Sequence, residues 1–204
     1  MTYKLKSVAI PKVADFTIIN VSDRAINNTT GGIYIDAPAR SSVDNMCALV
    51  KAVPTAPYKV SMNFKVLLTD TIQTNSVWKQ YSKFGCVWRS SSDGYMTPIV
   101  VTCRGANAYD ISANTIGVFK FRSTTDYYAD YTSITQPWYI QWIQLCDDGV
   151  NRSVNLSRDG INWYLLHSMA RTDFITPDQI GFCISPWSIE THIILNSFKV
   201  ETTG

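Results

Sequence analysis

The chain has 204 residues and a formal net charge of +2, with 46% hydrophobic and 17% charged residues. This balance predicts one packed globular domain and excludes a largely disordered chain, because enough apolar surface is present to be buried. Lys and Arg are scattered and form no phosphate-binding patch, so we expect no nucleic-acid partner.

The N-terminal segment, residues 1–12, has only a short apolar run, which Pro11 interrupts. It lacks the pattern of a signal peptide, and no run of about 18 apolar residues follows elsewhere. We therefore expect no membrane insertion, and we expect the chain to be synthesised in a cytoplasm. We interpret residues 1–12 as an arm that contacts a neighbouring subunit, or as a first strand, and residues 13–204 as the folded domain.

The rest of the chain is rich in residues that favour strands, including eleven Tyr, eight Phe and six Trp. Turn signals separate short apolar or alternating runs, and the alternation of Val60, Met62, Phe64 and Val66 predicts a strand with one buried face. In chain order, strands are predicted at 31–38, 46–53, 58–68, 84–90, 97–105, 117–123, 137–149, 152–160, 162–169, 179–185 and 190–202. The only helical turn is predicted at Thr176–Ile180. The fold class is therefore all-β, with two packed antiparallel sheets.

The stretch Arg152 to His167 places the pair Asp159-Gly160 between two alternating runs. Such a pair predicts a two-residue hairpin loop, because Asp and Gly tolerate positive φ. Ser157 is expected to hydrogen-bond the turn backbone, and Trp163 to cover the hairpin from the second strand. We therefore assign Asp159 to turn geometry rather than to catalysis.

The same region carries a resemblance to a known family. The pattern Ser-x-Asp-Gly-x-x-Trp at 157–163, followed by Thr-Pro-x-Gln-Ile-Gly at 176–181, resembles the concanavalin A-like lectin/glucanase sandwiches, in particular the type found in bacteriophage structural and tail proteins. The resemblance extends from about Asp15 to the C-terminus. It implies a jelly roll in which a curved sheet packs on a flatter one, and a module that binds carbohydrate or holds a virion together.

Catalytic and metal sites are not predicted. Glycoside hydrolysis needs two facing carboxyl groups, whereas Glu190 and Glu201 are the only glutamates and most aspartates lie in apparent turns. His167 and His192 are distant in sequence and are interpreted as structural. The run Cys146 to Asn151 offers oxygen ligands that would suit calcium, but an Asp-Gly turn explains it better. The expectation is no enzyme activity, no metal and no cofactor.

Aromatic residues are the candidate carbohydrate- or partner-binding groups, because sugars stack on aromatic faces beside polar side chains. Three tyrosines lie in an apparent polar loop, Thr124 to Ser133, and three further candidates border the turn at 91–94. These residues are Tyr127, Tyr128, Tyr131, Trp88, Arg89 and Tyr95. The alternatives are core packing for Trp88 and a protein interface for the tyrosines.

The five cysteines are odd in number, lack metal-site spacing, and are interpreted as buried thiols.

Taken together, the sequence features and the resemblance predict a non-enzymatic bacteriophage virion protein, tail-associated or capsid-decorating. We expect it to form a homo-oligomer, to contact other virion proteins and to bind host-surface carbohydrate. The alternative is a glycan-active enzyme or the carbohydrate-binding accessory module of a glycosidase.

Overall fold

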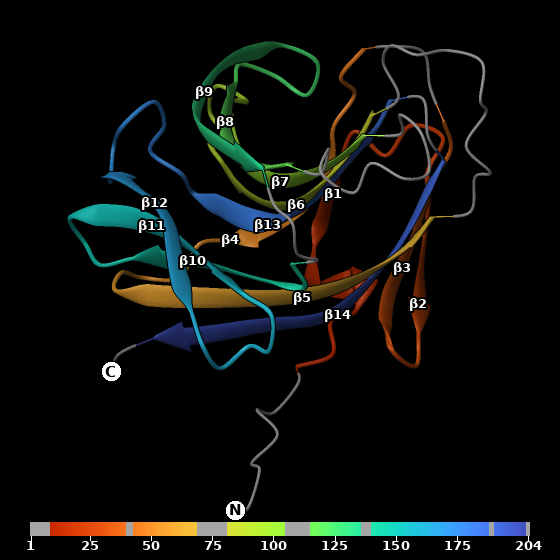
Figure 1. Ribbon diagram of the computed structural model, residues 1–204, viewed down its shortest axis with the longest axis horizontal. Coiled ribbons are helices and arrows are strands. Elements are labelled where there is room, and N and C mark those ends of the chain that lie inside the picture. The colour runs from red at the N-terminus through yellow and green to blue at the C-terminus, as the bar shows by residue number, and fades with distance from the viewer. Residues whose placement is uncertain are drawn as a thin grey trace, which may run out of the picture.

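Two antiparallel sheets of seven strands each are stacked face to face in the computed structural model (Figure 1). The structure describes residues 9–39, 43–68, 81–104, 115–135, 140–187 and 190–202. Across these ranges the only helical element is a single 3-10 turn at Val13–Asp15. The predicted all-β sandwich is therefore confirmed.

The first sheet, sheet A, has the strand order β1-β4-β13-β6-β7-β8-β9. Its strands are β1 (Thr17–Ile19), β4 (Cys47–Ala52), β13 (Gln179–Pro186), β6 (Tyr81–Arg89), β7 (Met96–Arg104), β8 (Thr115–Phe121) and β9 (Tyr127–Thr135). Strands β8 and β9 curl at one end of the sheet, so sheet A is the more curved layer (Figure 1).

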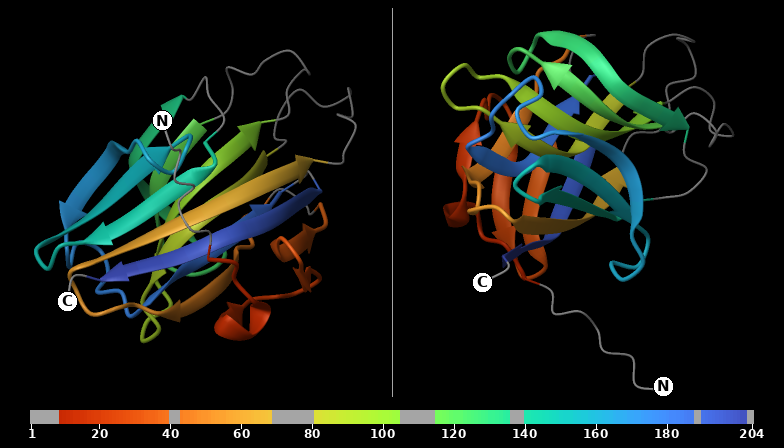
Figure 2. Two further views of the ribbon diagram at one scale, coloured as in Figure 1. Left: turned by 90° about the horizontal axis from the view of Figure 1, so that it is seen from below. Right: turned by 90° about the vertical axis from the view of Figure 1, so that its left-hand side faces the viewer.

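The second sheet, sheet B, has the strand order β12-β11-β10-β5-β14-β3-β2. Its strands are β12 (Tyr164–Ala170), β11 (Asn151–Ser157), β10 (Trp142–Asp147), β5 (Tyr58–Leu68), β14 (Thr191–Thr202), β3 (Gly32–Ala37) and β2 (Ala25–Thr29). The long strands β5 and β14 pair over eleven positions and run side by side across its centre (Figure 2).

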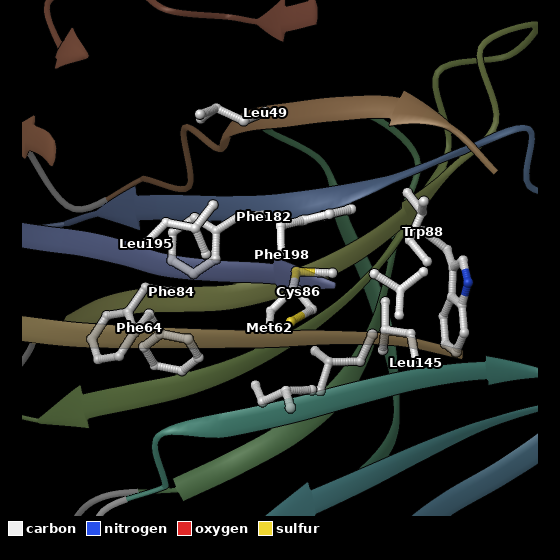
Figure 3. Packing of buried hydrophobic residues seen from close by; sticks show 14 of the residues in the cluster. Leu49, Met62, Phe64, Phe84, Cys86, Trp88, Leu145, Phe182, Leu195 and Phe198 are labelled. Carbon is white, nitrogen blue, oxygen red and sulfur yellow. The ribbon is translucent and has the colours of Figure 1, made fainter. Parts of the chain in front are cut away.

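The main hydrophobic core fills the space between the sheets, as period-two burial requires. Phe64 of sheet B packs against Phe84 and Phe182 of sheet A, with ring centroids 5.8 and 5.5 Å apart. Figure 3 shows these rings between the two layers, with Trp88 and Leu145 toward one end of the same core.

A second hydrophobic cluster lies on the opposite face of sheet A. It consists of Met46, Ala48, Val50, Val87, Met96, Val100, Phe121 and Cys183, all essentially buried. These residues alternate along their strands with members of the main core, so they point away from sheet B. Both faces of sheet A are therefore covered at its centre.

Two sequence-based expectations about local structure are wrong. The predicted polar loop at Thr124 to Ser133 contains most of β9, an edge strand whose side chains are largely exposed. The predicted helical turn at Thr176–Ile180 is instead extended chain leading into β13. Strands β1 and β2 were not anticipated, because they are short and only partly buried.

Part of the proposed N-terminal arm, residues 1–8, lies outside the described residues. Ala9 is held against β14: its N–H donates to Ser197 Oγ at 3.3 Å, and its carbonyl accepts from Phe198 N at 2.9 Å. The part of the arm that the structure describes therefore contacts this chain's own last strand.

The thiols of Cys47, Cys86 and Cys183 are free and buried, as expected, whereas Cys146 is half-buried. Burial raises the pKa of Cys47 to about 11. No helix in the described ranges is both long enough and apolar enough to cross a membrane.

Candidate functional site

A cavity of about 490 Å³ opens on the outer face of sheet B, and we call it the outer pocket. Its lining includes Lys59, Gln144, Asp148, Ile161, Trp163 and Glu201. Lys59 on β5 is the register partner of Cys146 on β10 and of Glu201 on β14, so it lies between them. Because these positions alternate with core residues, their side chains point out of the sandwich.

The loop between β11 and β12 supplies the wall of the outer pocket. Ser157 Oγ donates to Asp159 Oδ1 at 2.9 Å, and the same Asp159 oxygen accepts from the N–H groups of Ile161 and Asn162, both at 2.8 Å. These bonds fix the loop that carries Ile161 and Trp163. They also hold the pKa of Asp159 below its usual range, chiefly through the backbone N–H of Asn162.

This geometry corrects one detail of the prediction. The connection spans six residues, 158–163, rather than two, and only Gly160 takes a positive φ, +71°. A Cβ at Gly160 would lie 2.8 Å from the Trp142 ring, so the loop folds back closely onto β10. Asp159 is a turn-forming residue, as expected, but it acts as a hydrogen-bond acceptor rather than through positive φ.

The polar floor of the outer pocket is held in place by side-chain hydrogen bonds. Gln144 Nε2 donates to Ser61 Oγ at 2.9 Å, and Asn155 Nδ2 donates to Gln144 Oε1 at 3.3 Å. The half-exposed Trp163 indole and the exposed Ile161 form the apolar side. The pocket thus combines an aromatic wall with preorganised polar groups, and its volume suits a small ligand.

The aspartate carboxylates around the outer pocket are held by hydrogen bonds and an ion pair with nearby residues. Asp147 is buried, pairs with Arg171 at 2.9 Å, and accepts from Gly149 N. Asp148 accepts from the N–H groups of Val150 and Asn151, and these bonds lower its pKa. The run at 146–151 therefore forms an Asp-Gly turn, which is the interpretation preferred over a calcium loop.

A separate aromatic group lies where the edge strands β9 and β12 come to the same side of the molecule (Figure 1). Phe174 stacks between Tyr95, at 5.4 Å, and Tyr128, at 6.0 Å. Phe174 has φ +64°, a strained conformation for a bulky residue that such packing must stabilise. We call Tyr95, Phe174 and Tyr128 the aromatic stack.

Two cations and a third tyrosine surround the aromatic stack. The Arg122 guanidinium lies 3.9 Å from the Tyr128 ring centroid, and Lys120 Nζ lies 4.0 Å from that of Tyr131. Tyr131 donates to the Asp173 carbonyl at 3.2 Å, and burial raises the pKa of Tyr131. Phe174 and Arg122 both contact the Tyr128 ring, so its faces are not freely available to stack on a sugar.

The structure brings together three of the six candidate binding residues: Tyr95, Tyr128 and Tyr131. Tyr127 turns away and packs on Phe119 and Phe121, with its hydroxyl on Asp130 at 2.6 Å.

Trp88 is fully buried in the core, so the alternative interpretation, core packing, holds for it. Its indole N–H donates to the Tyr58 hydroxyl at 3.0 Å. Arg89 bonds Gln179 Oε1 at 2.6 Å. Sequence reasoning missed Phe174, Lys120 and Arg122. It treated Trp163 only as hairpin packing, although the aromatic residue after an Asp-Gly turn was a usable signal.

The buried Arg152 contacts both Trp88 and the loop that carries Phe174. The Arg152 guanidinium lies 5.1 Å from the Trp88 ring and donates through Nη2 to the Asp173 carbonyl at 2.7 Å. Burial lowers the pKa of Arg152. Arg152 therefore anchors the loop that carries Phe174.

The sheet order and the face-to-face stacking define a concanavalin A-like sandwich, and comparison with known proteins supports this class. No protein-family model and no curated protein matches the chain. Similar solved structures include a functionally unknown protein from Saccharomyces cerevisiae (TM-score 0.65, 9% identity, covering 95% of this chain and 99% of that one).

Two lectin-type structures are also similar. One is a legume lectin-like domain from Entamoeba histolytica (TM-score 0.57, 10% identity, 100% of both chains). The other is the exoplasmic/lumenal domain of VIP36 with Ca²⁺ and Man3GlcNAc bound (TM-score 0.56, 11% identity, 96% of this chain and 88% of that one). At these identities the likeness establishes the fold alone.

Proposed function

We propose that this chain is a non-enzymatic glycan-binding module and that the outer pocket is its binding site. The observation that carries the proposal is the pairing of the Trp163 indole with the fixed amide of Gln144 across one cavity. Sugar rings present apolar C–H faces to an aromatic wall and hydroxyls to amide, carboxylate and ammonium groups. The similarity to lectin-type sandwiches, one of them solved with an oligosaccharide, supports the same function.

The carboxylates of the outer pocket favour binding over hydrolysis. A glycosidase needs one carboxylic acid that stays protonated near neutral pH, which requires a raised pKa. The backbone hydrogen bonds of Asp148 lower its pKa, and Asp147 is buried in an ion pair with Arg171. Glu201 is engaged by Lys199 at 2.8 Å. This arrangement supports a module without hydrolytic activity.

The test is a glycan-array screen followed by calorimetry with the best ligand. Replacing Trp163→Ala should weaken binding by about 1–3 kcal/mol, the range for losing an aromatic contact in an interface, while Trp163→Phe should retain part of the affinity. The matched control is Tyr127→Ala with Tyr128→Ala. Unchanged affinity in this double variant places binding in the outer pocket, whereas loss of affinity there and not in Trp163→Ala would move the site to the aromatic stack.

Two results would overturn the proposal itself. One is the absence of binding to any arrayed glycan, and the other is release of reducing sugar from a bound glycan.

We also propose that the module belongs to a bacteriophage particle, on the strength of the resemblance carried by residues 157–181. Deleting residues 1–12 should then abolish incorporation into the particle while the β domain stays folded by circular dichroism. A deletion variant that is incorporated normally would count against the arm, and absence of the full chain from the particle would refute the virion setting.

A further inference from the structure

A cluster of histidine and carboxylate groups lies on the outer face of sheet B, far from the outer pocket. Asp36 on β3 is the register partner of His192 on β14, and both alternate with the core residues Ile35 and Ile193. Their side chains therefore point out of the sandwich. His192 and Glu201 are nine positions apart on β14, a separation of roughly 30 Å at the usual strand rise, so the cluster is independent of the pocket.

Three potential ligand atoms converge in this cluster. His192 Nδ1 lies 3.5 Å from Asp36 Oδ1, and His192 Nε2 lies 3.1 Å from Glu190 Oε1. One ligand atom from each of the three residues lies within 4.8 Å of the other two. The Tyr34 hydroxyl is 2.6 Å from His192 Nδ1, and the Tyr34 ring stacks on the imidazole. The His192 side chain is only 11% exposed, so the group is held rather than freely solvated.

The hydrogen bonds of the cluster leave one oxygen without a donor. The Tyr34 hydroxyl and Glu190 Oε1 lie within hydrogen-bond distance of the two ring nitrogens of His192, Nδ1 and Nε2. Asp36 Oδ1 is buried and accepts no hydrogen bond. Among the described residues, His192 is the only ion-pair partner of either carboxylate. Two carboxylates thus face one imidazole, and no Lys or Arg within the described ranges pairs with either of them.

We propose that Asp36, Glu190 and His192 bind a divalent transition-metal ion such as Zn²⁺. The ion would place a positive charge between the two carboxylates and give Asp36 Oδ1 a partner. Two ligands of a tetrahedral zinc at about 2.0–2.2 Å are roughly 3.3–3.6 Å apart, so the three ligand atoms, which lie within 4.8 Å of one another, need to close in only slightly to bind the ion. An imidazole nitrogen in the set favours zinc over calcium or magnesium. Water completes the coordination, and the ion ties β3 to the segment entering β14.

The experiment titrates Zn²⁺ into the metal-free, tag-free full chain by calorimetry and follows thermal unfolding with and without the ion. We expect one equivalent to bind and to raise the melting temperature. His192→Gln and Asp36→Asn should each weaken binding at least about tenfold, since loss of even a supporting group costs that much in metal sites. His167→Gln is the matched control, because this other histidine packs on Tyr131 instead, and it should bind like the wild type.

The spectrum of the Co²⁺-substituted chain then identifies the ligand type. Nitrogen and oxygen ligation should give no thiolate charge-transfer band, whereas such a band would place the ion on a cysteine and overturn the site. Equal Zn²⁺ affinity in wild type and His192→Gln, or no saturable binding, would also overturn it. If His192→Gln fails to fold in EDTA, the near-isosteric variants Asp36→Asn and Glu190→Gln carry the same test.

Discussion

The outer faces of the two sheets differ in what covers them. At the centre of sheet A both faces are apolar and buried, and β13 is buried at seven consecutive positions. In sheet B, β11 alternates between buried and more exposed residues, and the outer face carries the outer pocket and the histidine cluster. Continuous apolar runs therefore indicate strands covered on two sides, and alternation indicates strands with a free face. The free face is where the chain can place binding groups.

The segment before β4 explains part of the coverage over sheet A. Asp44 pairs with Lys83 at 2.7 Å and accepts from Trp187 Nε1 at 2.9 Å. Lys83 also lies 5.6 Å from the Phe121 ring of the second cluster. A buried ion pair beside apolar groups holds its geometry only when its hydrogen bonds are made, as they are here.

The largest expected effect is in the core that both sheets share. Phe182→Ala removes a ring that is fully buried and packs on Phe64, so it should lower the free energy of unfolding by about 3–5 kcal/mol. Urea unfolding followed by tryptophan fluorescence measures the change. A loss below about 1 kcal/mol would mean that the two sheets do not pack through this ring.

A matched pair of cysteine substitutions tests the comparison between the two outer faces directly. Cys183→Ser places a shorter and more strongly hydrated hydroxyl in the fully buried second cluster, where the thiol lies 3.5 Å from the Cys86 carbonyl, and should cost about 1–3 kcal/mol. Cys146→Ser, on the outer face of sheet B, should change stability by less than about 0.5 kcal/mol. Cys146 is half-buried there, and Gln144 and Asn155 already offer hydrogen bonds.

The same urea unfolding experiment measures both cysteine variants. Equal costs for the two would show that the outer face of sheet A is as open as that of sheet B. A larger cost for Cys146→Ser would reverse the comparison.

The sequence predicted the elements whose burial pattern is regular. The alternation in β5 and the continuous apolar run of β13 are local properties, so both strands were anticipated. The edge strand β9 was read as a loop because its exposed polar and tyrosine residues show no buried period. An edge strand pairs with one neighbour only, and β9 pairs with β8 alone, so one side of it is open to solvent and few of its side chains need to be apolar.

The candidate sites depend on contacts between residues distant in sequence. The tyrosines of the aromatic stack were identified by residue type, but Phe174 is brought to them by the loop after β12. Asp36 and His192 meet only through the register of β3 with β14. A linear pattern holds no information on that register, so the sequence did not indicate that these two residues lie together.

An effect smaller than that of Cys183→Ser is expected in the loop that places Trp163 on the free face of sheet B. Asp159→Asn keeps the shape of the side chain but removes its negative charge. Three donors hydrogen-bond to this carboxylate: the backbone N–H groups of Ile161 and Asn162, and the side-chain amide of Asn162. We expect a lower melting temperature at pH 7, by less than for Cys183→Ser, and weaker glycan binding. Asp93→Asn is the matched control in the β6–β7 hairpin of sheet A, where the carboxylate accepts from Tyr95 N.

The pH dependence of this variant follows from the direction of the Asp159 shift. Its folded-state pKa lies below the ordinary value of 3.8, so the unfolded chain binds the proton more readily. The stabilisation is therefore complete well above pH 4 and is lost as the pH falls through the folded pKa. Differential scanning calorimetry should show the melting-temperature gap between wild type and Asp159→Asn narrowing toward pH 2. A gap that stays constant with pH would show that the loop depends on the shape of the side chain and not on its charge, and Trp163 would then be positioned by packing on the outer face alone.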